Sequence, residues 1–340
     1  MTRWATRRRA AACLALALLA LLAACAPRFA QPGPRTAAPS LGETFVAADG
    51  TVLPYRVWRP ARAVPRAVIV AVHGYNDYSN AFADSARRWR EAGITTYAYD
   101  QRGFGKTRPR GLWAGYRPMV DDLVAFTALV RARHPGTPLF LLGSSMGGAV
   151  VLVALADPRL GPVAGAILAA PAVWGWSTMP VPYTVSLWLA AHTVPWLTLS
   201  GRGLERVPSD NTAMLRRLGR DPLVIKESRV DTLYGLVTLM DAALDAAARA
   251  RGPILVLYGE HDQIVPPGPI LRMLARLKIR PDSPRSPRRV AIYEKGYHML
   301  LRDLEAETVR DDIAAWIFDP TAPLPSRADR RGVTRLEARK

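Results

Sequence analysis

Cysteine is scarce in this sequence: the 340 residues include two, Cys13 and Cys25. So few cysteines exclude a disulfide scaffold. Long apolar runs are scarce as well. A single short one spans residues 10–24, which excludes a polytopic membrane protein. Apolar residues make up 49% of the chain and charged residues 22%, a globular balance that excludes disorder and a collagen-like fibre. The length suits one large domain or two smaller ones.

Acidic residues are also in deficit, because 46 Lys and Arg face 28 Asp and Glu and leave a net charge of +18. Four of the arginines precede residue 25, so the rest of the chain carries +14. This surplus reflects either arginine-rich codon usage or attraction to anionic lipid head groups. No nucleic-acid recognition motif accompanies it, so we expect no nucleic-acid partner.

Residues 1–24 have the three parts of a signal peptide: a basic start, an apolar stretch and a small-residue exit. The apolar stretch of about 15 residues would span roughly 22 Å as a helix, short of the ~30 Å hydrocarbon core. It ends in Leu22-Ala23-Ala24-Cys25, which resembles the lipobox of bacterial lipoproteins. The resemblance implies cleavage before Cys25 and a lipid on Cys25, in the cell envelope, facing the periplasm or the exterior. The alternative is an uncleaved anchor or an ordinary signal with an incidental cysteine.

Residues 25–42 carry four prolines and little apolar periodicity, which predicts a flexible tether after the lipidated cysteine. Beyond it, short apolar runs alternate with helical patterns. The runs that we predict to be strands are 67–72, 94–99, 139–142, 254–258 and 290–293. Unbroken apolar strands separated by amphipathic helices predict an α/β protein with a mostly parallel sheet and helices on both faces. Residues 51–58 alternate more and predict an antiparallel edge strand.

The alternation of strand and helix patterns stops between residues 172 and 251. Four tryptophans lie there within 23 residues and are followed by helical patterns. We interpret the segment as a helical cap inserted between two parts of one core, residues 43–171 and 252–320. Residues 321–340 are polar and basic, which predicts a flexible tail.

The strongest local motif is the pentapeptide around Ser145, Gly143-Ser144-Ser145-Met146-Gly147. It follows an apolar strand and precedes a helical pattern, as a G-x-S-x-G nucleophile elbow requires. The sharp turn presents the serine to solvent, and a neighbouring base activates its hydroxyl. Ser144 is the rival nucleophile, but Ser145 is the central residue of the motif.

A base and an acid are expected further along the chain, in the order Ser, Asp or Glu, His. Of the five histidines, His298 alone follows a late strand pattern and precedes the final helix. Asp262 lies just past the end of strand 254–258, where it could orient the imidazole. Glu260 is the alternative acid. No cluster of His, Cys and Asp has the spacing of metal ligands, so we expect neither a metal nor a cofactor.

With these motifs the chain resembles the α/β-hydrolases, specifically their monoacylglycerol lipase and lysophospholipase-like branch. The matching segments are His73-Gly74, residues 100–105, residues 143–148, residues 259–262 and Tyr297-His298. The resemblance implies the α/β-hydrolase fold, and it implies an oxyanion hole formed by the backbone N–H groups of Tyr75 and Met146. Ser144 stands where that branch usually has histidine.

The sequence therefore predicts a serine esterase that acts through an acyl-enzyme on a lipid or other small ester, with a monoacylglycerol or a lysophospholipid as the expected substrate. The apolar side chains of the cap would line the acyl-chain site, contact a membrane, or simply pack the cap against the sheet. Two alternatives stay open: a serine peptidase of the aminopeptidase type, and a non-catalytic lipid-binding envelope lipoprotein.

Overall fold

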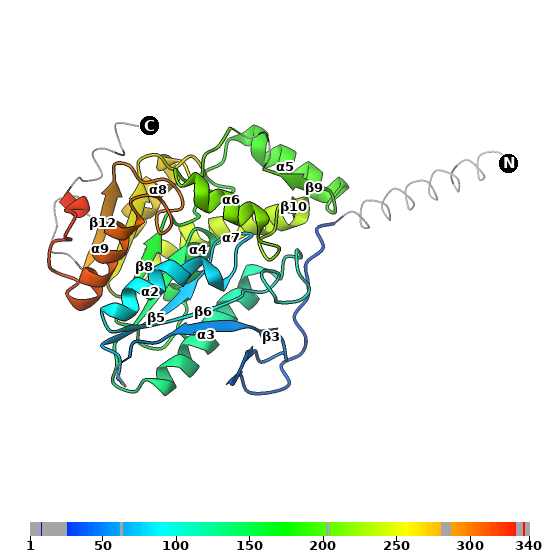
Figure 1. The fold of residues 1–340 in the computed structure, drawn as a ribbon. Helices are drawn as coiled ribbons and strands as arrows, with labels where there is room; N and C mark the ends of the chain where they lie inside the picture. The colour runs from blue at the N-terminus through cyan, green and yellow to red at the C-terminus, as the bar shows by residue number, and fades with distance from the viewer. Residues whose placement is uncertain are drawn as a thin grey trace.

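A seven-stranded sheet forms the centre of the structure (Figure 1). The structure is a computed structural model, and it describes residues 26–61, 64–201, 203, 205–279 and 287–330, together with Arg8 and Leu336. The strands in spatial order are β12 (Arg288–Tyr293), β11 (Ile254–Gly259), β8 (Gly165–Ala169), β7 (Leu139–Ser144), β5 (Ala67–Val72), β6 (Ile94–Tyr99) and β4 (Tyr55–Trp58). All pair in parallel except β4, which runs antiparallel to β6 at the edge.

Helices cover both faces of this sheet, as Figure 1 shows. Successive side chains of β5 point to opposite faces, so Val68, Val70 and Val72 pack in one core cluster and Ala67, Ile69 and Ala71 in the other. The first cluster lies under α3 (Tyr116–Arg133), α4 (Met146–Ala156), α7 (Val230–Ala246) and α8 (Pro267–Arg276). The second lies under α2 (Ala83–Glu91), which follows the 3-10 helix η1 (Ser79–Phe82), and under α9 (Ala306–Phe318).

The predicted α/β class is confirmed, and each predicted parallel strand is present. Of the edge strand predicted over residues 51–58, residues 55–58 form β4, whereas Val52–Leu53 pair in a separate small sheet. Three strands are longer than the apolar runs that predicted them: β7 ends at Ser144, β11 ends at Gly259, and β12 begins at Arg288. Sequence analysis missed β8. Its five residues include Gly165, Ala166 and Ala169, and therefore carry little of the β-branched signal.

The segment predicted to be a cap divides into two parts. Residues 181–229 form α5 (Val181–Thr193), β9 (Thr198–Ser200), α6 (Thr212–Arg220) and β10 (Glu227–Arg229), and β9 pairs antiparallel with β10. Figure 1 shows these elements together on the side of the molecule opposite α3. By contrast, α7 packs against α4 and its inner residues belong to the main core. With η2 (Ala247–Arg249) it completes the crossover from β8 to β11, so the last part of the predicted cap belongs to the α/β layers.

Residues 26–42, the described part of the predicted tether, lie against the body. Phe29 packs on the main core, and the Ala30 N–H donates to the Trp113 carbonyl at 2.7 Å. A small antiparallel sheet follows, made of β1 (Ser40–Leu41), β2 (Phe45–Val46) and β3 (Val52–Leu53). The predicted signal peptide and Cys25 lie outside the described residues, apart from Arg8.

A cavity of about 730 Å³ lies between residues 29–49 and α3. Arg35 and Arg159 share the carboxylate of Asp121 at its lining, with N–O distances of 2.9 and 2.7 Å. None of the three predicted catalytic residues lines it. This cavity is therefore separate from the expected site.

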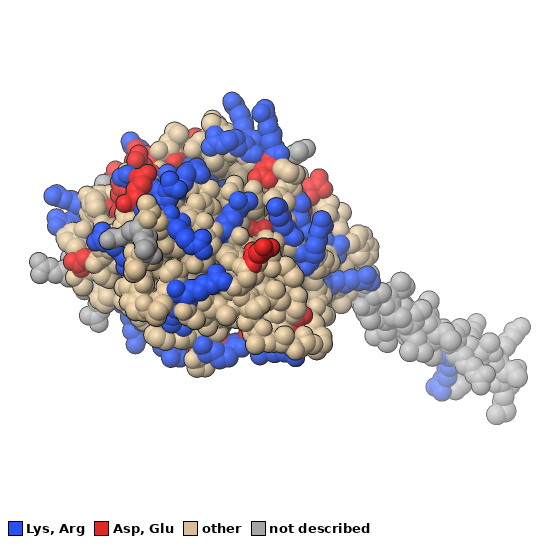
Figure 2. Space-filling model, turned by 60° about the horizontal axis from the view of Figure 1, so that its bottom comes forward, with Lys and Arg blue, Asp and Glu red and all other residues tan. Residues whose placement is uncertain are grey.

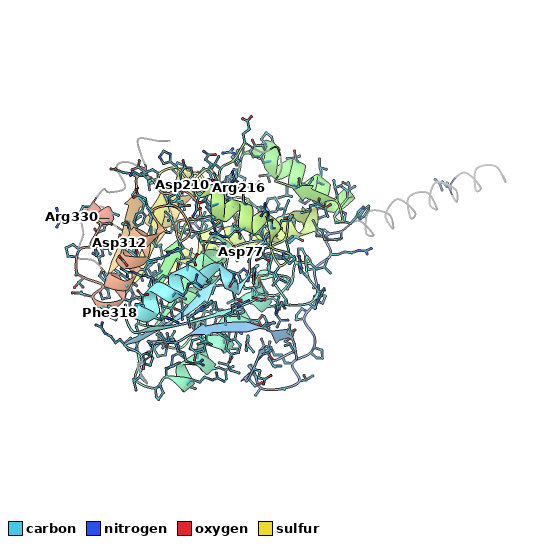
Figure 3. All side chains as sticks on the ribbon, in the orientation of Figure 1. Asp77, Asp210, Arg216, Asp312, Phe318 and Arg330 are labelled. Carbon is cyan, nitrogen blue, oxygen red and sulfur yellow. The ribbon has the colours of Figure 1, made fainter. Side chains whose placement is uncertain are left out.

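The prediction of a flexible tail is wrong for residues 321–330, which pack on the body. Arg289 of β12 donates to Asp329 at 2.9 Å, and both side chains are buried. Asp312 of α9, labelled in Figure 3, accepts hydrogen bonds from the Tyr293 hydroxyl at 2.9 Å and from the Ser326 N–H at 3.0 Å. The 3-10 helix η3 (Ala328–Arg330) ends this packed stretch.

Basic side chains are spread over the face of the molecule in Figure 2 and outnumber the acidic ones there. They do not gather in a single stripe on this face. Across the part of the chain that the structure describes, no helix combines the length and the apolar character needed to span a bilayer.

Arg102, which follows β6, joins the N-terminal segment to the core. Its guanidinium donates to Asp49 at 2.6 Å and to Asp122 of α3 at 2.6 Å, and all three side chains are buried. We expect Arg102→Ala to lower the free energy of unfolding by about 3–5 kcal/mol, because it leaves two carboxylates buried without their partner. Urea unfolding measures this loss. The matched control is Arg35→Ala, which removes an exposed ion pair and should leave the free energy of unfolding unchanged within error. Equal free energies of unfolding for the two variants would contradict the prediction.

Candidate active site

Ser145 lies at the sharp turn between β7 and α4, with φ +52° and ψ −116°. A positive φ is rare and strained for a residue with a side chain, and in this position it marks a nucleophile elbow. The backbone of Ser145 is held on both sides: its N–H donates to the Ala169 carbonyl at 2.9 Å, and its carbonyl accepts from the Ala172 N–H at 3.0 Å. The turn is thereby fixed against β8.

The elbow requires glycine because its backbone approaches β5 closely. A Cβ on Gly147 would lie 1.9 Å from the Val72 carbonyl oxygen, a distance at which the strand itself would have to move. A Cβ on Gly74, in the loop after β5, would lie 3.3 Å from the Ser145 Cβ. These contacts place the backbone of residues 72–74 directly beside the serine.

The structure brings Asp262 and His298 to Ser145, although they come from separate loops at the carboxyl ends of β11 and β12. His298 Nδ1 lies 2.8 Å from Asp262 Oδ2, and His298 Nε2 lies 2.8 Å from Ser145 Oγ. An ionised carboxylate only accepts, so Nδ1–H donates to Asp262, and in that tautomer Nε2 can accept the Ser145 hydroxyl. This is the arrangement in which a serine proton can pass to an imidazole.

Asp262 is fixed by its own loop. Its side chain is fully buried, and Oδ1 accepts the N–H groups of Ile264 at 2.8 Å and Val265 at 3.0 Å. The second oxygen, Oδ2, is left for His298. The carboxylate therefore has one orientation, which sets the tautomer and the direction of the imidazole.

The loop after β5 brings Tyr75 to the same edge of the sheet. His73 is buried there: its Nδ1 lies 2.9 Å from the Gly74 carbonyl, and its Nε2 accepts from the Gln101 N–H at 2.9 Å. Burial lowers the pKa of His73 below its usual range, consistent with a neutral ring that shapes the loop. Gln101 lies in the matching segment 100–105, but the sequence assigned it no role; its side-chain amide also donates to the His73 carbonyl at 2.8 Å.

Met146 is the first residue of α4, so its N–H is one of those that a helix leaves without an intrahelical acceptor. It directly follows Ser145. Tyr75 directly follows Gly74, where an added Cβ would lie 3.3 Å from the Ser145 Cβ. Both predicted oxyanion-hole residues therefore lie next to the serine turn.

The alternative nucleophile and the alternative acid do not bond to the imidazole. Ser144 is the last residue of β7, and His298 Nε2 is hydrogen-bonded to Ser145. It is likewise Asp262, and not Glu260, that bonds to the imidazole. His261 stacks on Tyr297, with ring centroids 5.2 Å apart. Within the described residues no three His, Cys, Asp or Glu side chains are grouped so that they could hold a metal ion.

Residues 63–305 match the hydrolase family described as "Serine aminopeptidase, S33". The chain belongs to this family. Its fold and its serine elbow agree with that membership, and its relatives among characterised proteins narrow the activity.

Two proteins similar to this chain are lipases. The monoacylglycerol lipase of Mycolicibacterium smegmatis is 27% identical over 279 residues, which cover 81% of this chain and 95% of that protein. The human monoglyceride lipase is 27% identical over 289 residues, covering 82% of this chain and 90% of that one. These relatives and the family identify the chain as a serine ester hydrolase.

Solved structures confirm the α/β-hydrolase fold. The monoacylglycerol lipase of Paleococcus ferrophilus superposes with a TM-score of 0.65 at 23% identity and covers 79% of this chain and 99% of its own. A soluble variant of the Saccharomyces cerevisiae monoglyceride lipase, in complex with a substrate analogue, gives 0.66 at 22% identity, with coverage of 86% and 99%.

Replacing Gly147 by alanine tests the tight packing of the elbow. We expect Gly147→Ala to lower the free energy of unfolding by about 3 kcal/mol or more and to abolish esterase activity, because the new Cβ collides with the backbone of β5. Thermal unfolding and turnover of a soluble ester measure the two effects. Gly219→Ala is the control, since a Cβ there meets nothing within 4 Å. A Gly147→Ala enzyme as stable and active as this control would contradict the packing argument.

Proposed function

We propose that Ser145 is the nucleophile of this esterase, His298 its general base and acid, and Asp262 the residue that orients His298. The observation that supports this proposal is the chain of two 2.8 Å hydrogen bonds from Asp262 through His298 to Ser145. His298 takes the proton as Ser145 Oγ attacks the ester carbonyl, and it then returns the proton to the departing alcohol. Water cleaves the acyl-enzyme by the same proton route.

In this proposal the backbone N–H groups of Tyr75 and Met146 form the oxyanion hole. As the carbonyl carbon becomes tetrahedral its oxygen gains negative charge, and two donors fixed in advance stabilise that charge without reorganising. Loss of one such donor typically raises the barrier by about 3–4 kcal/mol. The contact between Gly74 and Ser145 supports the position of the first donor.

The proposed substrate is a monoacylglycerol or a lysophospholipid. Two observations support a lipid ester: the relatives carry monoacylglycerol lipase names, and the cap is rich in apolar side chains. The family description names an aminopeptidase, which keeps a peptide substrate as the second candidate. An aminopeptidase must bind the charged α-amine of its substrate, whereas a monoacylglycerol is neutral.

The test is fatty-acid release from a monoacylglycerol by the purified protein. We expect release by the wild type, none by Ser145→Ala, and near wild-type release by the matched control Ser144→Ala, because only Ser145 bonds to the imidazole. Circular dichroism checks that each variant is folded.

Two outcomes would contradict the proposal. Full activity of a folded Ser145→Ala protein would exclude that residue as nucleophile. Cleavage of aminoacyl-arylamides without cleavage of acylglycerols or lysophospholipids would instead support the peptidase.

We further propose that the mature protein is a lipoprotein of the cell envelope, held on a membrane by a lipid on Cys25 and facing the periplasm or the exterior. The lipobox-like sequence before Cys25 supports the anchor. The cap supports contact with the lipid surface, because α5 leaves its large apolar side chains in solvent: Val181 is 74% exposed, and Trp188 and Leu189 are each 50% exposed. Exposed apolar surface of this extent is typical of a membrane or partner contact.

Acylation of Cys25 is tested by labelling with an alkyne-tagged fatty acid in a bacterial host. We expect the wild type to incorporate the label and to sediment with membranes, and Cys25→Ala to lose the label. Cys13→Ala is the control, because Cys13 would leave with the signal peptide and its loss should change nothing. Label retained by Cys25→Ala would contradict the anchor.

A further inference from the structure

One segment of the cap, residues 206–211, contacts both loops that carry the His298–Asp262 pair. The Val207 N–H donates to the side chain of Gln263, the residue after Asp262, at 2.9 Å. The Met299 N–H, next to His298, donates to the Pro208 carbonyl at 3.0 Å. The cap is thus attached immediately beside two members of the proposed triad.

Ser209 makes the most buried of these contacts, with Asp303. The Ser209 hydroxyl donates to Asp303 Oδ1 at 2.6 Å, and the Tyr297 N–H donates to Asp303 Oδ2 at 2.8 Å. Ser209 is 1% exposed and Asp303 is 5% exposed. Burial raises the pKa of the Asp303 carboxyl, while these two hydrogen bonds act to lower it. A single carboxylate therefore links the cap to the residue that precedes His298.

A second cap segment, residues 221–228, holds the loop that carries Tyr75. Asn76 has a positive φ of 64°, and its side-chain amide donates to the Ser228 hydroxyl at 2.8 Å. The Asn76 carbonyl accepts from the Ile225 N–H at 2.9 Å, and the Tyr78 hydroxyl donates to Asp221 at 2.8 Å. Residues of the cap therefore hold the strained residue next to the proposed oxyanion donor.

The two loops also meet each other beneath the cap. Asp77, labelled in Figure 3, forms an ion pair with Arg302 of the loop that follows His298. Asp210, also labelled there, accepts from the Leu304 N–H at 2.9 Å. The ion pair therefore links the two loops directly, and Asp210 adds one more contact between the cap and the loop after His298.

We propose that the cap positions the catalytic loops, with Ser209 and Asp303 as positioning residues for His298, and Ser228 as the positioning residue for the loop of Tyr75. This inference rests on the function proposed above. Each of these hydrogen bonds joins the cap to a loop that carries a residue of the proposed site, so their loss would leave that loop less well oriented.

The experiment compares three cap serines in turnover of a soluble short-chain ester. We expect Ser209→Ala and Ser228→Ala each to lower kcat about tenfold with KM within about twofold, because each removes one hydrogen bond that positions a catalytic loop. The control is Ser186→Ala, whose hydroxyl donates to the Pro182 carbonyl within α5 and touches neither loop. It should retain wild-type kinetics.

A purely structural role would lower the unfolding temperature and leave kcat of the folded enzyme unchanged. Values of kcat within twofold of wild type in both folded variants would therefore overturn the proposal, and either variant tests it if the other does not fold. Ser145→Ala in the same assay separates the two hypotheses. Activity in that variant would refute the proposed function, whereas an inactive Ser145→Ala beside two fully active cap variants would refute only the positioning role.

Discussion

The proposed active site depends on one backbone conformation, the positive φ of Ser145 at the turn from β7 to α4. In that conformation the hydroxyl leaves the sheet and meets His298 Nε2 at 2.8 Å. The conformation is unfavourable for a residue with a side chain, so the surroundings must impose it. They do so through hydrogen bonds to both sides of the peptide and through the close approach of Gly147 to β5.

The rest of the site is built from parts far apart in the chain. Asp262 and His298 arrive on loops after β11 and β12, and parallel strands bring these loops to the edge of the sheet where β7 ends. The loops are then fixed from above by the cap, through pairs such as Ser209 with Asp303. The sheet thus sets the approximate positions of the three residues, and hydrogen bonds between loops set their final orientation.

Much of this could be predicted from sequence, because the signals are local. An apolar run followed by a glycine-flanked serine specifies both a buried strand and an elbow, and the chain order of Ser145, Asp262 and His298 identifies the partners. The features that the sequence did not predict depend on contacts between distant residues or have a weak sequence signal. The short β8 is built from small residues, and the helical pattern of α7 does not say whether it packs on the cap or on α4. The packing of residues 26–42 was missed because it depends on distant partners, such as the Trp113 carbonyl that accepts from the Ala30 N–H. Ser209 and Asp303 are 94 residues apart, and neither belongs to a motif.

The central claim is that Ser145 is activated by His298 in the folded protein. Its most direct test is reaction of the purified protein with a fluorophosphonate, which bonds to an activated serine oxygen and releases fluoride, followed by peptide mass spectrometry. We predict one adduct per chain, on Ser145, and none in a folded His298→Ala variant. Labelling of another residue, or a folded wild-type protein that does not react, would contradict this account.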